Sequence, residues 1–178
     1  MNLVQLDKNK ITGINDAWIK SAIQFYPDLG QLELEQFFAV IKDNGAIGEL
    51  KDNKSVYFSV EDDNKTHALV EVIQSKKGKE VWIKMMDITL CPELEFSTQD
   101  DSNTAERLKV FVTALIGIFN LTKGVTLANT VKVYGRTELL LTFLRGMHDS
   151  IKAVTELGTI KGIDVSIEGR WLVFRTKA

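Results

Sequence analysis

Three charged residues of this 178-residue chain lie where a side chain could take part in catalysis or binding. Asp87 interrupts the apolar run VWIKMMDITL at 81–90. A buried carboxylate there could act as a general base, whereas a place at the margin of a sheet would leave it facing solvent. Glu71, in the neighbouring predicted strand, has the same two interpretations. Arg136 follows Gly135 in a predicted turn, where its guanidinium could bind an anion or form a structural ion pair.

The two histidines and the single cysteine form no recognisable catalytic or metal-binding pattern. His67 begins a predicted strand, and His148 lies near the end of a predicted helix, where a protonated ring would favour the helix dipole. Cys91 has no histidine adjacent in sequence, so we expect a small buried residue and not a nucleophile. Because the spacing of zinc ligands is missing, the sequence predicts no metal site.

The composition indicates one globular domain over residues 1–178, with 44% hydrophobic residues and a formal net charge of -2. This charge balance gives no reason to expect a nucleic acid or a membrane surface as partner. The first ten residues lack the apolar run of a signal peptide, and a lone cysteine cannot form an internal disulfide. The apolar segment at 110–119 is shorter than the roughly 20 residues of a membrane span. This segment therefore predicts a core helix. The lone cysteine fits a reducing compartment, and we expect a cytoplasmic protein.

Hydrophobic periodicity predicts helices and strands in the first half of the chain. A strand is expected at 3–6. A helix capped by Asn15 should end at Pro27, and a second helix should bury Phe37 and Phe38. Strands at 55–60, 67–74 and 81–90, joined by short polar turns, predict an antiparallel meander.

The second half adds two helices and three strands. An acidic loop at 93–101 should lead to a helix that begins with a capping box of Asn103 and Glu106. A strand at 130–134 precedes a helix capped by Thr137, and the segment 163–176 predicts a hairpin. The fold class is therefore α/β (α+β), with a mixed, mostly antiparallel sheet and helices on both faces. The strands at 81–90 and 130–134 should be parallel.

This element order resembles the GNAT family of N-acetyltransferases over nearly the whole chain. Local support comes from LCP at 90–92 and VYGRTELLLTFL at 133–144. The segments VKVYGR and EGRWLVFR are similar to those of small GNAT-like proteins encoded by tailed bacteriophages. In active members an acyl-CoA lies where the fourth and fifth strands splay. The resemblance thus implies that backbone groups from Ile88 to Leu90 would hold pantetheine. Ser102, Asn103 and Thr104, at a helix N-terminus, would lie at the pyrophosphate.

The chain departs from the family pattern at both functional positions. Where a glycine-rich phosphate loop is expected, it has Glu95-Phe96-Ser97-Thr98, and no glycine lies between Gly78 and Gly117. Acidic residues nearby would repel a pyrophosphate. Leu144 stands where active members often have a tyrosine acid. Tyr134 could replace that acid only if its hydroxyl pointed into the cleft.

These departures predict a non-catalytic GNAT-like protein that acts through protein–protein contacts. It would be a bacteriophage structural, virion-associated or accessory protein, located in the host cytoplasm or the virion. Its partner would be another protein or a second copy, and no cofactor is expected. The alternative is a divergent acyl-CoA-dependent N-acyltransferase that uses acetyl-CoA, with Asp87 or a water as base and Tyr134 as acid. A third hypothesis is a small-ligand binding module that uses the same cleft.

Overall fold

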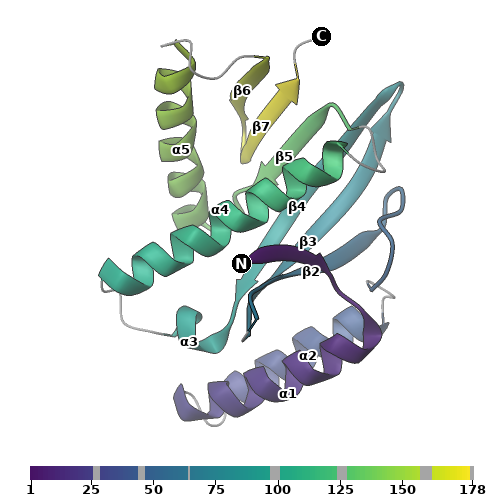
Figure 1. Ribbon diagram of the computed structural model, residues 1–178, viewed down its shortest axis with the longest axis vertical. Coiled ribbons are helices and arrows are strands. Elements are labelled where there is room, and N and C mark those ends of the chain that lie inside the picture. The colour runs from purple at the N-terminus through teal and green to yellow at the C-terminus, as the bar shows by residue number, and fades with distance from the viewer. Residues whose placement is uncertain are drawn as a thin grey trace.

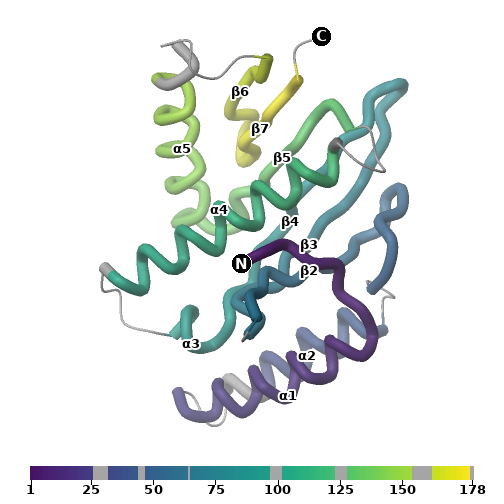
Figure 2. The backbone as a smooth tube through the Cα atoms, in the orientation of Figure 1, coloured from purple at the N-terminus to yellow at the C-terminus, as the bar shows by residue number. Residues whose placement is uncertain are grey.

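The structure is a computed structural model that describes residues 1–25, 29–43, 47–63, 65–96, 101–123, 128–156 and 162–176. Within these residues a seven-stranded sheet is flanked by five helices (Figure 1). Figure 2 traces the same path as a tube. In chain order the elements are β1 (Asn2–Gln5), α1 (Lys8–Phe25), α2 (Leu29–Asp43), β2 (Ser55–Glu61), β3 (Thr66–Lys77), β4 (Glu80–Leu90), α3 (Pro92–Glu95), α4 (Asp101–Lys123), β5 (Thr130–Tyr134), α5 (Glu138–Glu156), β6 (Ile163–Glu168) and β7 (Trp171–Thr176).

The sheet has the strand order β1-β2-β3-β4-β5-β7-β6. Its neighbouring strands are antiparallel except for β4 and β5, which are parallel from Trp82 opposite Thr130 to Met85 opposite Val133. The predicted meander, the parallel pair and the C-terminal hairpin are all confirmed. The prediction of a mixed, mostly antiparallel α+β sheet is therefore right.

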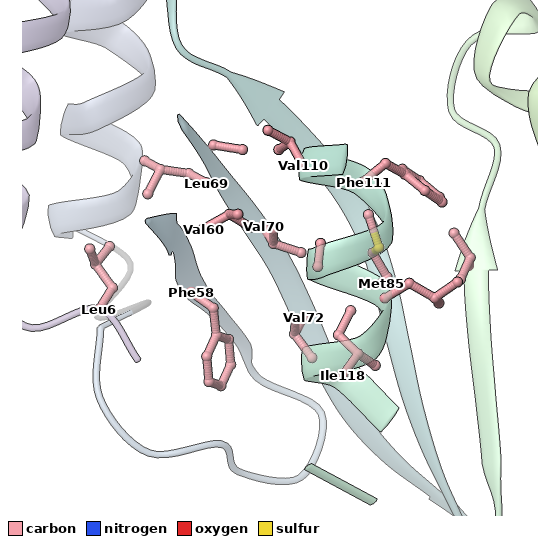
Figure 3. Close-up of a cluster of buried hydrophobic side chains, with 14 of the residues drawn as sticks. Leu6, Phe58, Val60, Leu69, Val70, Val72, Met85, Val110, Phe111 and Ile118 are labelled. Atoms are coloured by element: carbon pink, nitrogen blue, oxygen red, sulfur yellow. The ribbon is translucent and has the colours of Figure 1, made fainter. Parts of the chain in front are cut away.

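Helices cover both faces of the sheet. On one face, the ring of Phe37 in α2 contacts the ring of Tyr57 in β2, with centroids 5.8 Å apart. Phe58, the next residue along the strand, points to the opposite face. On that face Figure 3 shows Ile118 of α4 beside Val72 and Met85. α5 packs against α4, since the rings of Phe111 and Phe143 lie 5.0 Å apart.

The start of α1 differs from the prediction. The helix begins at Lys8, and Asp7 caps it, because its Oδ1 accepts hydrogen bonds from the backbone N–H groups of Asn9 and Lys10 at 2.8 Å each. Asn15 therefore lies inside the helix and is not its cap. The early turns contain Gly13, whose low helix propensity concealed them in the sequence, yet burial of Ile11 and Ile14 stabilises them.

The predicted capping box of α4 is also wrong. α4 already includes Asp101, so Asn103 and Glu106 lie within the helix. The predicted acidic loop contains a short helix, α3, which begins at Pro92, where proline's fixed φ suits a first helical position. The expected core helix is only half buried: Val110, Ala114 and Ile118 are fully covered, whereas the opposite side of α4 is exposed.

The turn before α5 depends on close packing. Thr137 caps the helix as predicted, since its Oγ1 accepts a hydrogen bond from the Leu140 N–H at 3.1 Å. A Cβ placed on Gly135 would lie 2.9 Å from the Cα of Leu141. Glycine is required at 135 because the helix returns against this backbone.

Candidate functional site

The cleft that the resemblance implies would lie where β4 and β5 stop pairing. Their parallel register ends at Met85 and Val133, after which β4 continues to Leu90 while the chain leaves β5 at Tyr134. β4 also contains a bulge: Met85 is opposite Val72, but Asp87 is opposite Glu71, so Met86 is the extra residue. Bulges redirect side chains, and this one lies immediately before Asp87.

Both carboxylate oxygens of Asp87 are engaged. Oδ1 accepts a hydrogen bond from the backbone N–H of Ile88 at 3.0 Å. Oδ2 forms an ion pair with the Nη1 of Arg136, which joins β4 to the turn after β5 beyond the end of their backbone pairing. The structure thus brings Asp87, Ile88 and Arg136 together. Of the two roles predicted for Arg136, the structure shows the ion pair with a carboxylate.

Two further polar residues share this surface with Asp87. Tyr57, Glu71 and Asp87 are direct neighbours across β2, β3 and β4. The hydroxyl of Ser55 donates a hydrogen bond to Glu71 at 2.5 Å. Burial raises the pKa of Tyr57, and the negative charges of Glu71 and Asp87 add to this. The sequence did not single out Tyr57. Its place beside Glu71 follows from the register of the predicted meander, which the sequence does not give.

The ring of Tyr134 packs against a neighbouring strand. Its half-buried ring lies against Trp171 of β7, with centroids 4.8 Å apart. The pKa of the neighbouring Arg170 is raised, chiefly by a hydrogen bond to Glu138 and to a smaller extent by Tyr134. Leu144 is fully buried in the core. The ring of the candidate acid therefore packs against an indole, and Leu144, which the resemblance would align with a tyrosine, is a core residue.

The candidate phosphate-binding residues lie on the first described turn of α4. Ser102 and Thr104 are exposed, and Asn103 is half-buried. Ser97 and Thr98, in the expected phosphate loop, lie outside the described residues. The nearby Arg107 ties α4 to α3, because its Nε donates a hydrogen bond to the carbonyl of Leu94 at 2.8 Å.

Cys91 and His67 form a buried junction where β3 begins and β4 ends. Cys91 is 1% exposed, and burial raises the pKa of its thiol to about 12, so the prediction of a small buried residue is confirmed. Its backbone N–H donates a hydrogen bond to the carbonyl of His67 at 2.8 Å. The Nε2 of His67 lies 2.7 Å from the Oδ2 of Asp62, and its Nδ1 lies 3.8 Å from the Oε1 of Glu106 in α4. The ring of His67 thus lies between the side chains of Asp62 and of Glu106 in α4.

His148 is not near a helix end as predicted. α5 continues to Glu156, and the Nδ1 of His148 lies 2.9 Å from the Oδ1 of Asp149. Its charge would therefore interact with a neighbouring carboxylate and not with the terminal carbonyl groups.

A cavity of about 400 Å³ lies away from the predicted cleft, between α1, the start of β3 and α3. Gly13 opens it, since a Cβ there would have no atom within 4 Å. The lining residues are Asn9, Lys10, Gly13, Ile14, Ala17, Trp18, Lys65, Thr66 and Glu93. None of the predicted site residues is among them, so this cavity is separate from the cleft of the ligand-module hypothesis.

A lysine cluster surrounds Trp82 on the sheet. The Nζ atoms of Lys77, Lys84 and Lys132 lie 5.5, 5.4 and 4.2 Å from the centre of its ring. Lys132 also pairs with Glu168 at 3.1 Å. The lysine-rich turn at 76–79 borders this cluster, because the pairing of β3 with β4 places Lys77 beside the indole of Trp82.

In the described part of the chain, no three His, Cys, Asp or Glu side chains are grouped so that they could hold a metal ion. Nor does any helix of that part combine the length and the apolar character required to cross a bilayer. No protein-family model and no curated protein sequence matches the chain. A functional assignment must therefore come from the geometry described above.

Proposed function

We propose that this chain is a GNAT-like protein that does not catalyse acyl transfer and acts through protein–protein contacts. Support for the scaffold comes from the strand order, from the single parallel pair β4–β5 and from the end of this pairing at Met85 and Val133, beyond which β4 continues. We further propose a structural or accessory role in a tailed bacteriophage, which rests on the resemblance of VKVYGR and EGRWLVFR alone.

The proposal rests mainly on the two interactions of the Asp87 carboxylate. An amine acyltransferase with a carboxylate base needs that carboxylate within hydrogen-bond reach of the amine, and it needs free backbone donors to hold pantetheine. Here one Asp87 oxygen takes the N–H of Ile88 and the other pairs with Arg136. The candidate base is therefore held in an ion pair. Its other oxygen takes the N–H of Ile88, which is one of the candidate pantetheine donors.

Two more observations agree with this proposal. Leu144 has no proton to donate, and the ring of Tyr134 packs against that of Trp171. Glu93 and Glu95 add negative charge in α3, before the helix N-terminus that would receive a pyrophosphate. Like charges in a partly desolvated cleft repel more strongly than in water.

Calorimetric titration of the protein with acetyl-CoA at low salt tests the proposal. We expect no binding heat at millimolar ligand for the wild type. Asp87→Ala is the informative companion variant, because it frees the Ile88 N–H without altering the core. Micromolar affinity of the wild type would contradict the proposal, whereas affinity acquired only by Asp87→Ala would support blockage by Asp87.

The stretch of β4 beyond Met85, which no longer pairs with β5, favours one alternative, a divergent acyl-CoA-dependent N-acyltransferase. In this case acetyl-CoA would lie beside Ile88 and Leu90, and Arg136 would have to release Asp87 before an amine could be deprotonated. Release of free thiol from acetyl-CoA in the presence of primary amines would reveal this activity. Loss of the thiol release in Asp87→Asn would assign it to this cleft.

A further inference from the structure

The outer face of α4 is apolar although it is exposed. Residues 110–122 contain no charged side chain. One side of this segment is in the core, yet Leu108, Val112 and Ile116 on the other side are 45%, 38% and 56% exposed. A surface helix normally presents charged or polar residues to water, and a helix that is apolar on both sides is normally covered on both.

The three exposed residues form one continuous ridge. Side chains four residues apart lie above one another on a helix, so Leu108, Val112 and Ile116 follow a single line. A turn of 100° per residue places Val112 and Ile116 nearly opposite Ala114, which is fully buried. α4 lies in front of the sheet in Figure 1, and no other element is drawn over it.

The ridge has the symmetry of a contact between two identical helices. α4 runs from Asp101 to Lys123, so Val112 is its middle residue, and Leu108 and Ile116 lie four positions to either side. A two-fold axis through Val112 would pair the helices antiparallel, with Leu108 of one copy against Ile116 of the other. Such a contact must be complementary to itself.

The charge of the ridge also suits a second copy. Identical faces bring like charges together across a two-fold axis, and this costs affinity unless the face is uncharged. Between residues 108 and 122 the only charged residue is Lys109. A strongly acidic or basic partner would find no complementary charges along this line.

We propose that two copies of this chain associate through the outer face of α4, packed antiparallel about Val112. This inference does not depend on whether acetyl-CoA binds. A contact centred on one helix per subunit is smaller than the roughly 800 Å² per partner of a standard interface, so we expect a reversible dimer with micromolar or weaker affinity.

Sedimentation equilibrium of the full chain over a wide concentration range is the first test. We expect a monomer–dimer equilibrium for the wild type. Val112→Glu should raise the dissociation constant about a hundredfold or more, because two carboxylates would then meet on the axis. Val40→Glu, at a residue of α2 that is 53% exposed, is the matched control and should leave the equilibrium unchanged.

A charge-swap pair tests the antiparallel orientation. Leu108→Glu and Ile116→Lys should each weaken association when present alone. When they are combined in one chain they should restore it, since each glutamate then faces a lysine of the other copy. A wild type that stays monomeric at millimolar concentration, a Val112→Glu variant with unchanged association, or a double variant no better than the single ones would overturn the proposal. Circular dichroism confirms that each variant is folded.

Discussion

At Gly117, α4 packs directly on Leu3 of β1, and substituting this glycine is a direct test of the fold. A Cβ at this position would lie 2.7 Å from Cδ2 and 3.0 Å from Cγ of Leu3, and closer still to the Cβ of Leu3. Carbon atoms in ordinary contact are about 3.5 to 4.0 Å apart. Gly117→Ala therefore requires α4 and β1 to separate by roughly 1 Å.

The expected magnitude is the difference between two effects. Overpacking of this kind costs about 1 to 3 kcal/mol, whereas replacing glycine by alanine inside a helix returns up to about 1 kcal/mol. β1 pairs with β2 alone, so it can shift more easily than a central strand. We expect Gly117→Ala to lower the free energy of unfolding by about 1 to 2 kcal/mol.

Urea denaturation followed by circular dichroism measures this change. The matched controls are Gly146→Ala and Gly13→Ala, both inside helices, where a new Cβ would have no atom within 4 Å. Each should raise the free energy of unfolding, by up to about 1 kcal/mol. Leu3→Ala should not rescue Gly117→Ala, because alanine retains the Cβ that is nearest. If Gly117→Ala proved as stable as the two controls, the packing of α4 on β1 would be wrong.

Three further results are expected. Cys91, whose thiol pKa is about 12, should resist a thiol reagent at pH 8 until denaturant is added, and rapid labelling of the native protein would contradict its burial. Arg175, and secondarily Lys132, lower the pKa of Glu168 below its ordinary 4.5. Glu168→Gln should therefore destabilise the protein at pH 7, and the difference should shrink in urea titrations below pH 4.5; a constant difference would exclude the ion pair. Asp87→Ala should lose about 1 kcal/mol of unfolding free energy, because Ile88 N–H loses its acceptor, and an unchanged urea midpoint would refute this.

Periodicity was sufficient to predict most elements but not their ends. The strands at 55–60, 67–74 and 81–90 are rich in β-branched and aromatic residues and are separated by polar turns, so local pattern determines them. The first turns of α1 contain Gly13 and depend on burial of Ile11 and Ile14, which is a tertiary effect. In the same way, Asn103 and Glu106 match a capping pattern, but α4 begins before them.

The candidate site was predicted as separate residues and not as an arrangement. Asp87 and Arg136 were both singled out for their residue types, yet their ion pair depends on the parallel register of β4 and β5 and on the bulge at Met86. No local sequence pattern reports either feature. The junction of His67 with Asp62 and Glu106 was missed for the same reason, since it joins three segments of the chain.

The hairpin of β3 and β4 has a consequence for the order of folding. Its strands pair from Ala68 opposite Leu90 to Lys77 opposite Glu80, across a two-residue turn in which Gly78 has a φ of 62°. These contacts join residues that are close in sequence, whereas the pairing of β1 with β2 places Asn2 opposite Glu61, which is far along the chain. Local contacts cost less chain entropy in the transition state. We expect substitutions at Gly78 to slow refolding and substitutions in β1 to speed unfolding, so that kinetics would distinguish the early hairpin from the late edge strand.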